Sequence, residues 1–534
     1  LSVLVAVPAA GAALLGFVPP LRRAAGRVIA LVIALVELAL GVYVAASVFD
    51  WSAPASYQVY ESHLWIPQIG ITWSLGVTSL GLVMVLLALG LVPLVLIAGW
   101  DEDEAADRGA YPALVLALGA FMVVIFAAYD LTVFYFAFEA MLVPLYLMIG
   151  RYGVGDEAAR HKAAMKFLLY SLFGGLVMLG GILYLWAMGS QAAQDVSTFF
   201  RIDTLAQILP SAPLVVQMII FVTFMVAFAI KAPMVPVHTW LPDTAAVARP
   251  GTSVLLVGVL DKIGTFGMIT LCLQLTPGAA VSAKWVMCIL AVISILWGGL
   301  SANGQNDIMR LVSYTSVSHF GFMVLGIFIG SQIALVGAMF YMVAHGVSIA
   351  AMFLLSGWLS RRGGTQDMRE YVGMQRVTPV LAGLWLVSGL ASIALPGLSG
   401  FVPEYLVLMG TWTVSGPLAL FAVLGVVIAA LYVLMPYQRV FTGAPDAERV
   451  GSADLDGRER LVLVPIIAAM LLLGLAPGAL TDALDGVAEQ VATTMSADSG
   501  RPAALSDPAA ATGPLAPADP SSPSAPTVTE GISK

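Results

Sequence analysis

Charged residues are scarce in this sequence, and their scarcity excludes an ordinary soluble domain. Only 10% of the 534 residues are Asp, Glu, Lys or Arg, whereas soluble proteins contain about 25%. Hydrophobic residues make up 60% of the chain, and its mean hydropathy is +0.93. Most of the chain is therefore predicted to lie in a membrane.

Cysteines and nucleotide-binding motifs are lacking as well. The only two cysteines, Cys272 and Cys288, are far apart in apolar segments, so neither a CxxC metal site nor a set of iron–sulfur ligands is present. We find no GxGxxG or GxxxxGKS/T motif, which argues against nucleotide binding. The net charge of −8 argues against nucleic acid. We therefore expect no cofactor and no metal in this chain.

Long apolar segments fill the chain from its first residue to about residue 480. A membrane-spanning helix needs roughly 20 such residues, so the sequence predicts an all-α integral membrane protein with fourteen transmembrane helices. They are expected at residues 1–20, 28–49, 73–98, 110–128, 131–150, 163–187, 213–240, 251–275, 283–301, 310–330, 332–358, 379–413, 417–440 and 460–480. No basic residue precedes the first apolar segment, so we expect a helix there and not a cleaved signal.

Basic residues alternate between the loops, and this alternation predicts the orientation. The loops after odd-numbered helices contain nearly all of them, for example Arg22, Arg151 and Arg361, whereas the even-numbered loops offer only Arg201 and Lys284. Positive residues stay on the cytoplasmic side. Both termini are therefore predicted on the outer side of the membrane.

A few ionisable residues remain inside the predicted spans, where each Lys or carboxylate costs about 2.5–3.5 kcal/mol. They are Glu139, Lys231, Lys262, Glu404, His238, His319 and His345. Such groups usually face a hydrated interior and mark an ion or proton path. Lys166 either belongs with them or extends to the interface. Residues at span ends or beside other charges are expected to be structural, namely Asp130, Asp243, Asp261 and Arg310.

The residue types suit protons better than other solutes. Burial disfavours the charged form of a lysine and a nearby carboxylate favours it, so a change of charge along the series would load or unload a proton. Histidines that titrate near neutral pH are natural relays between such sites.

Two predicted spans are broken, and each break adjoins a buried charge. Residues 228–243 read FAIKAPMVPVHTWLPD and residues 393–405 read IALPGLSGFVPEY, and proline interrupts a helix. Corresponding breaks in two halves indicate the ion site of a transporter built from repeats. We therefore predict two five-helix repeats, which we expect to be inverted. The predicted divisions are 1–109 (helices 1–3), 110–275 (first repeat, helices 4–8), 276–441 (second repeat, helices 9–13), 442–496 (loop and helix 14) and 497–534 (a disordered tail rich in Ala and Pro).

Around these charges the sequence resembles the antiporter-like subunits of respiratory complex I, which are related to Mrp-type cation/proton antiporters and membrane-bound hydrogenases. The similarity covers about residues 110–440. The motifs that carry it are FYFAFEAMLVPLYLMIG, FAIKAPMVPVHTWLPDTA, VGVLDKIGTFGM, NDIMRLVSYTSVSHFGFMVLG and AHG. Glu404 stands where subunits L and N usually carry a lysine, which favours the M type.

The resemblance implies proton translocation driven by distant NADH-to-quinone electron transfer in a bacterial inner membrane. Glu139 would pair with Lys231, Lys262 would lie centrally and Glu404 would serve the far side. His319 and His345 would relay protons between the lysines, with His238 a further candidate relay. FMN, iron–sulfur clusters and quinone are expected in other subunits. The implied partners are lipids and neighbouring membrane subunits, above all L and N.

Three alternatives stay open at this point. A subunit of a sodium/proton antiporter complex would share the fold and most of the charges, although Glu404 counts against it. A scaffold that pumps nothing would need a structural role for every buried charge. A stand-alone secondary transporter would have to bind a solute as an isolated chain.

Overall fold

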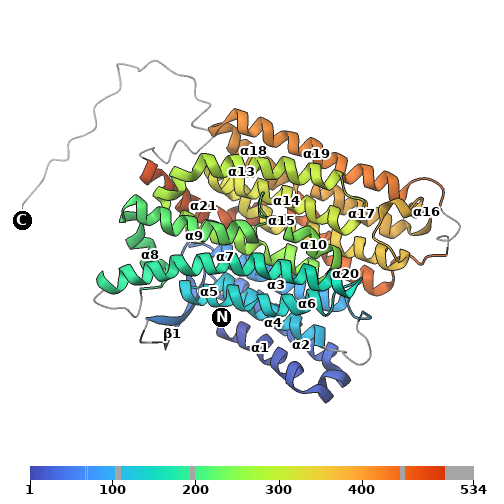
Figure 1. Ribbon diagram of the computed structural model, residues 1–534, viewed down its shortest axis with the longest axis horizontal. Helices are drawn as coiled ribbons and strands as arrows, with labels where there is room; N and C mark the ends of the chain where they lie inside the picture. The colour runs from blue at the N-terminus through green and yellow to red at the C-terminus, as the bar shows by residue number, and fades with distance from the viewer. Residues whose placement is uncertain (67, 69, 103–109, 193–198, 446–450, 500–534) are drawn as a thin grey trace, which may run out of the picture.

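The computed structural model describes residues 1–66, 68, 70–102, 110–192, 199–445 and 451–499. Within this part of the chain the helices run side by side as one bundle (Figure 1). Eleven of them are long and apolar enough to cross a membrane, or up to twelve if one bent pair counts as a single span. The predicted all-α membrane fold is thus confirmed. The count of fourteen stays a prediction, because two of the expected spans correspond to shorter helices.

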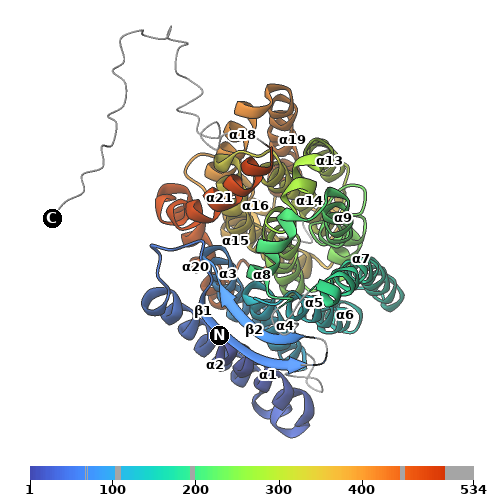
Figure 2. The same cartoon turned by 90° about the vertical axis from the view of Figure 1, so that its left-hand side faces the viewer.

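The N-terminal part contains three helices and a hairpin. Its elements are α1 (Ser2–Phe17), α2 (Pro19–Tyr43) with a π-helical extension (Val44–Val48), β1 (Gln58–Ile66), β2 (Ile71–Val77) and α3 (Ser79–Ala98). β1 and β2 pair antiparallel at the end of the bundle that faces the viewer in Figure 2. The predicted span 73–98 therefore began too early, because the helix starts only at Ser79. Residues 71–77 read ITWSLGV, whose β-branched and aromatic residues favour a strand, and α3 begins only after Thr78, whose side chain accepts a hydrogen bond from Gly81 N.

The middle of the chain contains several interrupted helices. Its elements are α4 (Ala110–Ala127), α5 (Leu131–Ala140), α6 (Leu142–Gly150), α7 (Glu157–Ala192), α8 (Ile202–Ile208), a 3₁₀ turn (Leu209–Ser211), α9 (Leu214–Lys231), α10 (Trp240–Val247), α11 (Pro250–Leu255), a π segment η5 (Leu256–Leu260), α12 (Lys262–Gly267) and a second π segment η6 (Met268–Leu273). The predicted break after Lys231 is present. The segment from α11 to the second π segment lies at the centre, since residues 251–273 are all buried.

The last part begins with long helices that pack around this centre. Its elements are α13 (Pro277–Asn303), α14 (Ile308–Phe328), α15 (Gln332–Gly363), a 3₁₀ turn (Met368–Glu370), α16 (Met374–Val377), α17 (Pro379–Ser392), α18 (Phe401–Val414), α19 (Gly416–Phe441), α20 (Gly457–Leu475) and α21 (Gly478–Ser499). The second predicted break separates α17 from α18. α14 and α15 are almost wholly buried, whereas α7 and α19 expose apolar side chains, as helices that face lipid do.

Helix α21 corrects the prediction for the end of the chain. We expected a single helix 14 at 460–480 and a disordered tail from residue 497. Instead α20 ends at Leu475, and α21 follows at an angle of 69°. Leu484, Val487, Ala488 and Val491 are buried on one side of it, at the i, i+3, i+4, i+7 spacing of an amphipathic helix. Of the predicted disordered tail, residues 500–534 lie outside the described part of the chain.

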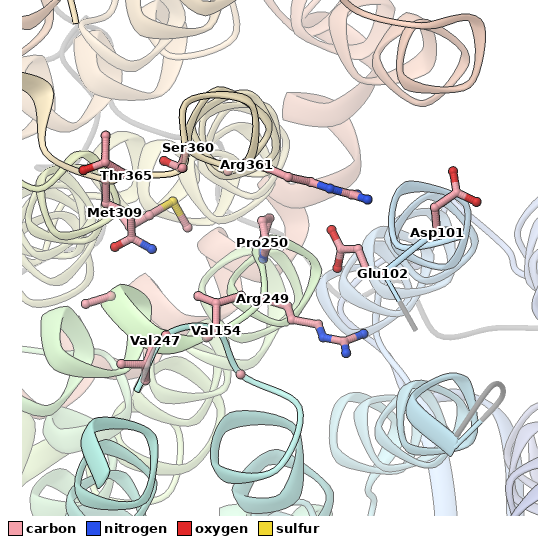
Figure 3. A pocket seen from close by; sticks show the side chains of 17 residues that line it. Asp101, Glu102, Val154, Val247, Arg249, Pro250, Met309, Ser360, Arg361 and Thr365 are labelled. Atoms are coloured by element: carbon pink, nitrogen blue, oxygen red, sulfur yellow. The ribbon is translucent and has the colours of Figure 1, made fainter. Parts of the chain in front are cut away.

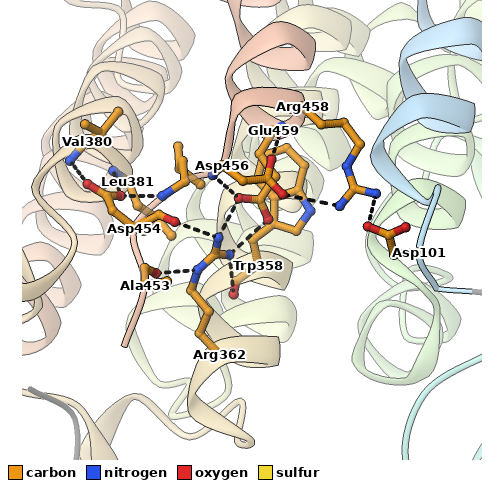
Figure 4. A network of polar contacts seen from close by, with 11 residues as sticks. Asp101, Trp358, Arg362, Val380, Leu381, Ala453, Asp454, Asp456, Arg458 and Glu459 are labelled. Atoms are coloured by element: carbon orange, nitrogen blue, oxygen red, sulfur yellow. Dashed lines mark hydrogen bonds and ion pairs between the residues drawn. The ribbon is translucent and has the colours of Figure 1, made fainter. Parts of the chain in front are cut away.

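A network of polar contacts ties α15, α17 and α20 together at the end of the bundle opposite the hairpin (Figure 4). Arg362 donates to Glu459 (3.1 Å) and to the Ala453 carbonyl (2.8 Å). The Asp454 carboxylate accepts from the backbone N–H groups of Val380 and Leu381 at the start of α17. These contacts fix the helix that leads into the second break.

Replacing Arg362 with Met is expected to destabilise the protein by about 3 kcal/mol, because it leaves the buried Glu459 carboxylate without its charged partner. The Arg362 and Glu459 side chains are only 16% and 6% exposed. The control is Arg369→Met, which breaks the surface pair with Asp367 and should change little. Thermal inactivation of the assembled complex measures both, and equal midpoints would contradict this expectation.

Candidate functional site

Glu139 lies near the end of α5 and faces a glycine of α7. A Cβ on Gly175 would lie only 1.5 Å from Glu139 Oε1, so a glycine is needed to leave room for the carboxyl group. That oxygen is buried without a hydrogen-bond partner in the described part of the chain. Glu139 interacts electrostatically with Lys231. The structure therefore brings together the first two residues that the sequence singled out.

Replacing Gly175 with Ala is expected to lower proton pumping about tenfold, because the added methyl group pushes the Glu139 carboxyl group out of place and small misplacements are costly in reactive sites. The matched control is Gly180→Ala on the same helix, where a Cβ would meet no atom within 4 Å. Pumping per assembled complex is the measurement. Equal rates in the two variants would show that the position of Glu139 does not matter.

Lys231 is the last residue of α9 and is 1% exposed. Its ammonium group lies 5.5 Å from the ring centre of Phe138 and 5.2 Å from that of Phe167. It has no hydrogen-bond partner among the described residues. The helix stops here because Pro233 and Pro236 follow, and the Trp240 indole donates back to the Ile230 carbonyl across the break (3.0 Å). A buried lysine at a helix break thus contacts two aromatic rings and interacts electrostatically with Glu139 and Asp261.

Lys262, the first residue of α12, contacts α15. Its Nζ donates to the Val257 carbonyl and to Nδ1 of His345 at 2.8 Å. His345 Nε2 in turn lies 3.3 Å from Ser316 Oγ. Both Lys262 and His345 are buried. This direct contact joins a residue of the first predicted repeat to a residue of the second.

His319 of α14 continues the series beyond His345. The two imidazole rings have centroids 5.0 Å apart at an angle of 75°. His319 Nε2 donates to the Ser392 carbonyl at the second break (2.9 Å), and the Tyr432 hydroxyl lies 3.2 Å from the same nitrogen. His319 thus contacts His345 on one side and the second break on the other.

Glu404 lies in the first turn of α18, directly after the second break, and is 4% exposed. The Tyr341 hydroxyl donates to Glu404 Oε2 at 2.8 Å. The rings of Tyr341 and His319 have centroids 5.7 Å apart. Tyr341 therefore bridges the last histidine and the last carboxylate of the series.

His238 is placed apart from this series. It lies in the first break, 6.1 Å from Tyr314 between ring centroids, and it interacts electrostatically with Lys166. Lys166 donates to Asp243 at 2.6 Å, as does Arg310. Lys166 thus ends in an ion pair.

A cavity of about 610 Å³ opens at the end of the bundle opposite the hairpin. Figure 3 shows it between the start of α11 and the end of α15. Asp101, Glu102, Arg249 and Arg361 contribute charged side chains to its lining. Farther into the bundle, α11 is continued by η5 and α12, where Lys262 lies, and α15 carries His345.

Three buried residues were not among the predicted members of the proton path. Asp261, expected to be structural, interacts electrostatically with both Lys231 and Lys262. Nothing in the sequence distinguishes Tyr341 from the other aromatic residues of the apolar segments. Glu37 of α2 is 1% exposed, and both of its oxygens are buried without a hydrogen-bond partner in the described residues; its place inside a predicted span was the available signal.

Comparison with known proteins places this arrangement in a family. The family model described as "NADH:quinone oxidoreductase/Mrp antiporter, TM" matches residues 128–429. Two relatives are named NADH-quinone oxidoreductase subunit M. The one from Mycobacterium tuberculosis is 41% identical over 93% of this chain and 94% of its own length. The one from Rhodobacter capsulatus is 34% identical over 94% of this chain and 98% of its own length. The chain therefore belongs to the membrane family of NADH:quinone oxidoreductases and Mrp antiporters. The predicted M-type, antiporter-like subunit of complex I is confirmed.

Solved structures agree with this assignment. A chain of respiratory complex I from Thermus thermophilus with bound NADH is 30% identical with a TM-score of 0.83, covering 92% of this chain and 99% of its own. A chain of the Mrp complex from Dietzia sp. DQ12-45-1b is 21% identical with a TM-score of 0.80, covering 93% of this chain and 100% of its own. The second similarity shows the fold alone.

Proposed function

We propose that this chain translocates protons through its buried series of Glu, Lys and His side chains, coupled to electron transfer from NADH to quinone elsewhere in the complex. The observation that carries the proposal is the sequence of contacts from Lys262 through His345, His319 and Tyr341 to Glu404. Glu139 and Lys231 precede this sequence. Intramembrane ionisable groups in contact with one another are typical of proton relays.

The residue types determine how such a path works. A neutral lysine amine accepts a proton and an ammonium donates one, and the balance between them follows the charge of neighbouring carboxylates. A change of charge near Glu139 would thus be passed on from Lys231 to Lys262. The histidines then carry the proton to Glu404, which releases it on the far side. The cavity beside α11 and α15 is the proposed access for water from one membrane face.

The wider setting of the chain is part of the proposal. It holds no redox centre, while FMN, iron–sulfur clusters and quinone bind to other subunits. Its neighbours are subunits L and N together with lipids. It lies in a bacterial inner membrane with both termini on the outer side. Residues 110–275 and 276–441 form two inverted repeats.

Neutralising either end of the path tests the proposal. Glu139→Gln and Glu404→Gln should each lower NADH-driven proton pumping in inverted membrane vesicles about tenfold or more, because proton transfer by a positioned group contributes about 10²-fold or more. The control is Glu157→Gln, whose side chain is 75% exposed. Pumping at the control rate in both variants, in fully assembled complexes, would refute the proposed path.

A further inference from the structure

We propose that Asp261 is the proton carrier between Lys231 and Lys262, so that the Asp261–Lys262 pair joins the two halves of the path. The inference rests on the proposed function and adds to it a residue that the sequence marked as structural. Asp261 and Lys262 are adjacent in the chain, and their side chains point to different neighbours.

On one side, α12 packs directly on the end of α9. A Cβ on Gly264 would lie 2.6 Å from both Ala232 N and the Phe228 carbonyl oxygen, so the two backbones approach as closely as a glycine permits. Asp261 precedes Gly264 by three residues and therefore lies on the same side of the helix. It faces the end of α9, where it interacts electrostatically with Lys231.

On the other side, Lys262 is rotated about 100° from Asp261 around the helix axis. Its Nζ donates to His345 on α15, away from α9. The Asp261–Lys262 pair therefore has one side chain directed to each half of the proposed path. A π-helical turn directly precedes it, closed by the bond from Asp261 N to the Leu256 carbonyl (2.9 Å), and such turns are frequent at functional sites.

Comparison with Asp130 distinguishes a carrier from a structural carboxylate. Both side chains are fully buried. The Asp130 carboxylate accepts hydrogen bonds from Thr72, Thr132 and Val133, and it caps α5. Neither oxygen of Asp261 has a hydrogen-bond partner in the described residues. Among the residues that the structure describes, Lys231 and Lys262 are the charged groups that interact with Asp261, and its oxygens are available to accept and release a proton.

The step balances without a further reactant. The Lys231 ammonium gives a proton to the Asp261 carboxylate, which leaves a neutral amine and a carboxylic acid. The carboxylic acid then gives that proton to the neutral amine of Lys262, which becomes an ammonium. The carboxylate is restored, and Lys262 can pass the proton on to His345.

The test compares Asp261→Asn with Asp261→Glu in the assembled complex. Asparagine keeps the shape and cannot carry the proton, so NADH-driven pumping per complex should fall about tenfold or more. Glutamate keeps the carboxylate and should retain most of the pumping. The matched control is Asp130→Asn, which should reduce the amount of assembled complex while the complexes that assemble pump at the wild-type rate.

Lys231→Ala distinguishes a failure of the carrier role of Asp261 from a failure of the proposed function. Normal pumping by Asp261→Asn together with loss in Lys231→Ala would overturn the carrier role and leave the proposed function standing. Normal pumping by both would refute the proposed function as well. If Asp261→Asn fails to assemble, infrared difference spectra of the working Asp261→Glu complex replace this test. A carboxylic acid band that forms on addition of NADH and is shifted relative to wild type would support the carrier role. A band at the wild-type position, or no band, would overturn it.

Discussion

Replacing Lys262 with Ala is expected to reduce NADH-driven proton pumping about 100-fold. Lys262 makes the contact with His345 by which the first half of the proposed path reaches the second. Removal of a positioned proton carrier typically costs at least this factor. Because pumping and electron transfer are coupled in the proposal, NADH:quinone turnover should fall with it.

The matched control for this prediction is Lys284→Ala. Lys284 lies on α13 beside the ring of Trp285 (5.1 Å) and is not part of the proposed path. Its replacement should leave pumping and turnover unchanged. If Lys262→Ala pumped as well as this control at the same level of assembled complex, Lys262 would have no role in transfer.

The second large effect is a loss of stability, which we expect when Gly298 is replaced by a larger residue. A Cβ on this residue would lie 2.6 Å from Ser318 N on α14 and 3.0 Å from its Cα, and small residues allow membrane helices to pack this closely. Gly298→Leu should therefore destabilise the protein by about 3 kcal/mol and displace the neighbouring His319. Thermal inactivation and the yield of assembled complex measure the loss.

Gly383→Leu is the corresponding control for packing. A Cβ on Gly383 of α17 would meet no atom within 4 Å, so a larger side chain there has space. Its yield and thermal midpoint should stay close to wild type. Equal losses in the two variants would indicate an effect of leucine itself and not of the contact between α13 and α14.

The broken helices were predictable because their cause is local. Proline has no N–H to donate and clashes with the preceding turn, so Pro233 and Pro236 end α9 whatever surrounds them. The buried charges could be found in the same way, since a lysine inside an apolar span is visible in the sequence. Both features led to the candidate site before any contact was known.

The roles that we propose for Asp261 and Tyr341 depend on tertiary contacts and were not predictable from the sequence. An aspartate beside a lysine reads as a local pair, and only the packing of α12 on α9 turns Asp261 toward Lys231. A tyrosine among aromatic residues reads as packing until Glu404 from another helix is placed against its hydroxyl. The helix α21 was missed for a different reason, because overall polarity concealed a short apolar periodicity.

The most direct test of the proton path is NADH-driven acidification of inverted vesicles that contain fully assembled complex with Lys231→Ala. Lys231 has no hydrogen-bond partner among the described residues, so its replacement breaks no hydrogen bond there. Our account predicts that acidification is lost together with coupled NADH:quinone turnover. Protons pumped per NADH at the wild-type ratio would contradict it.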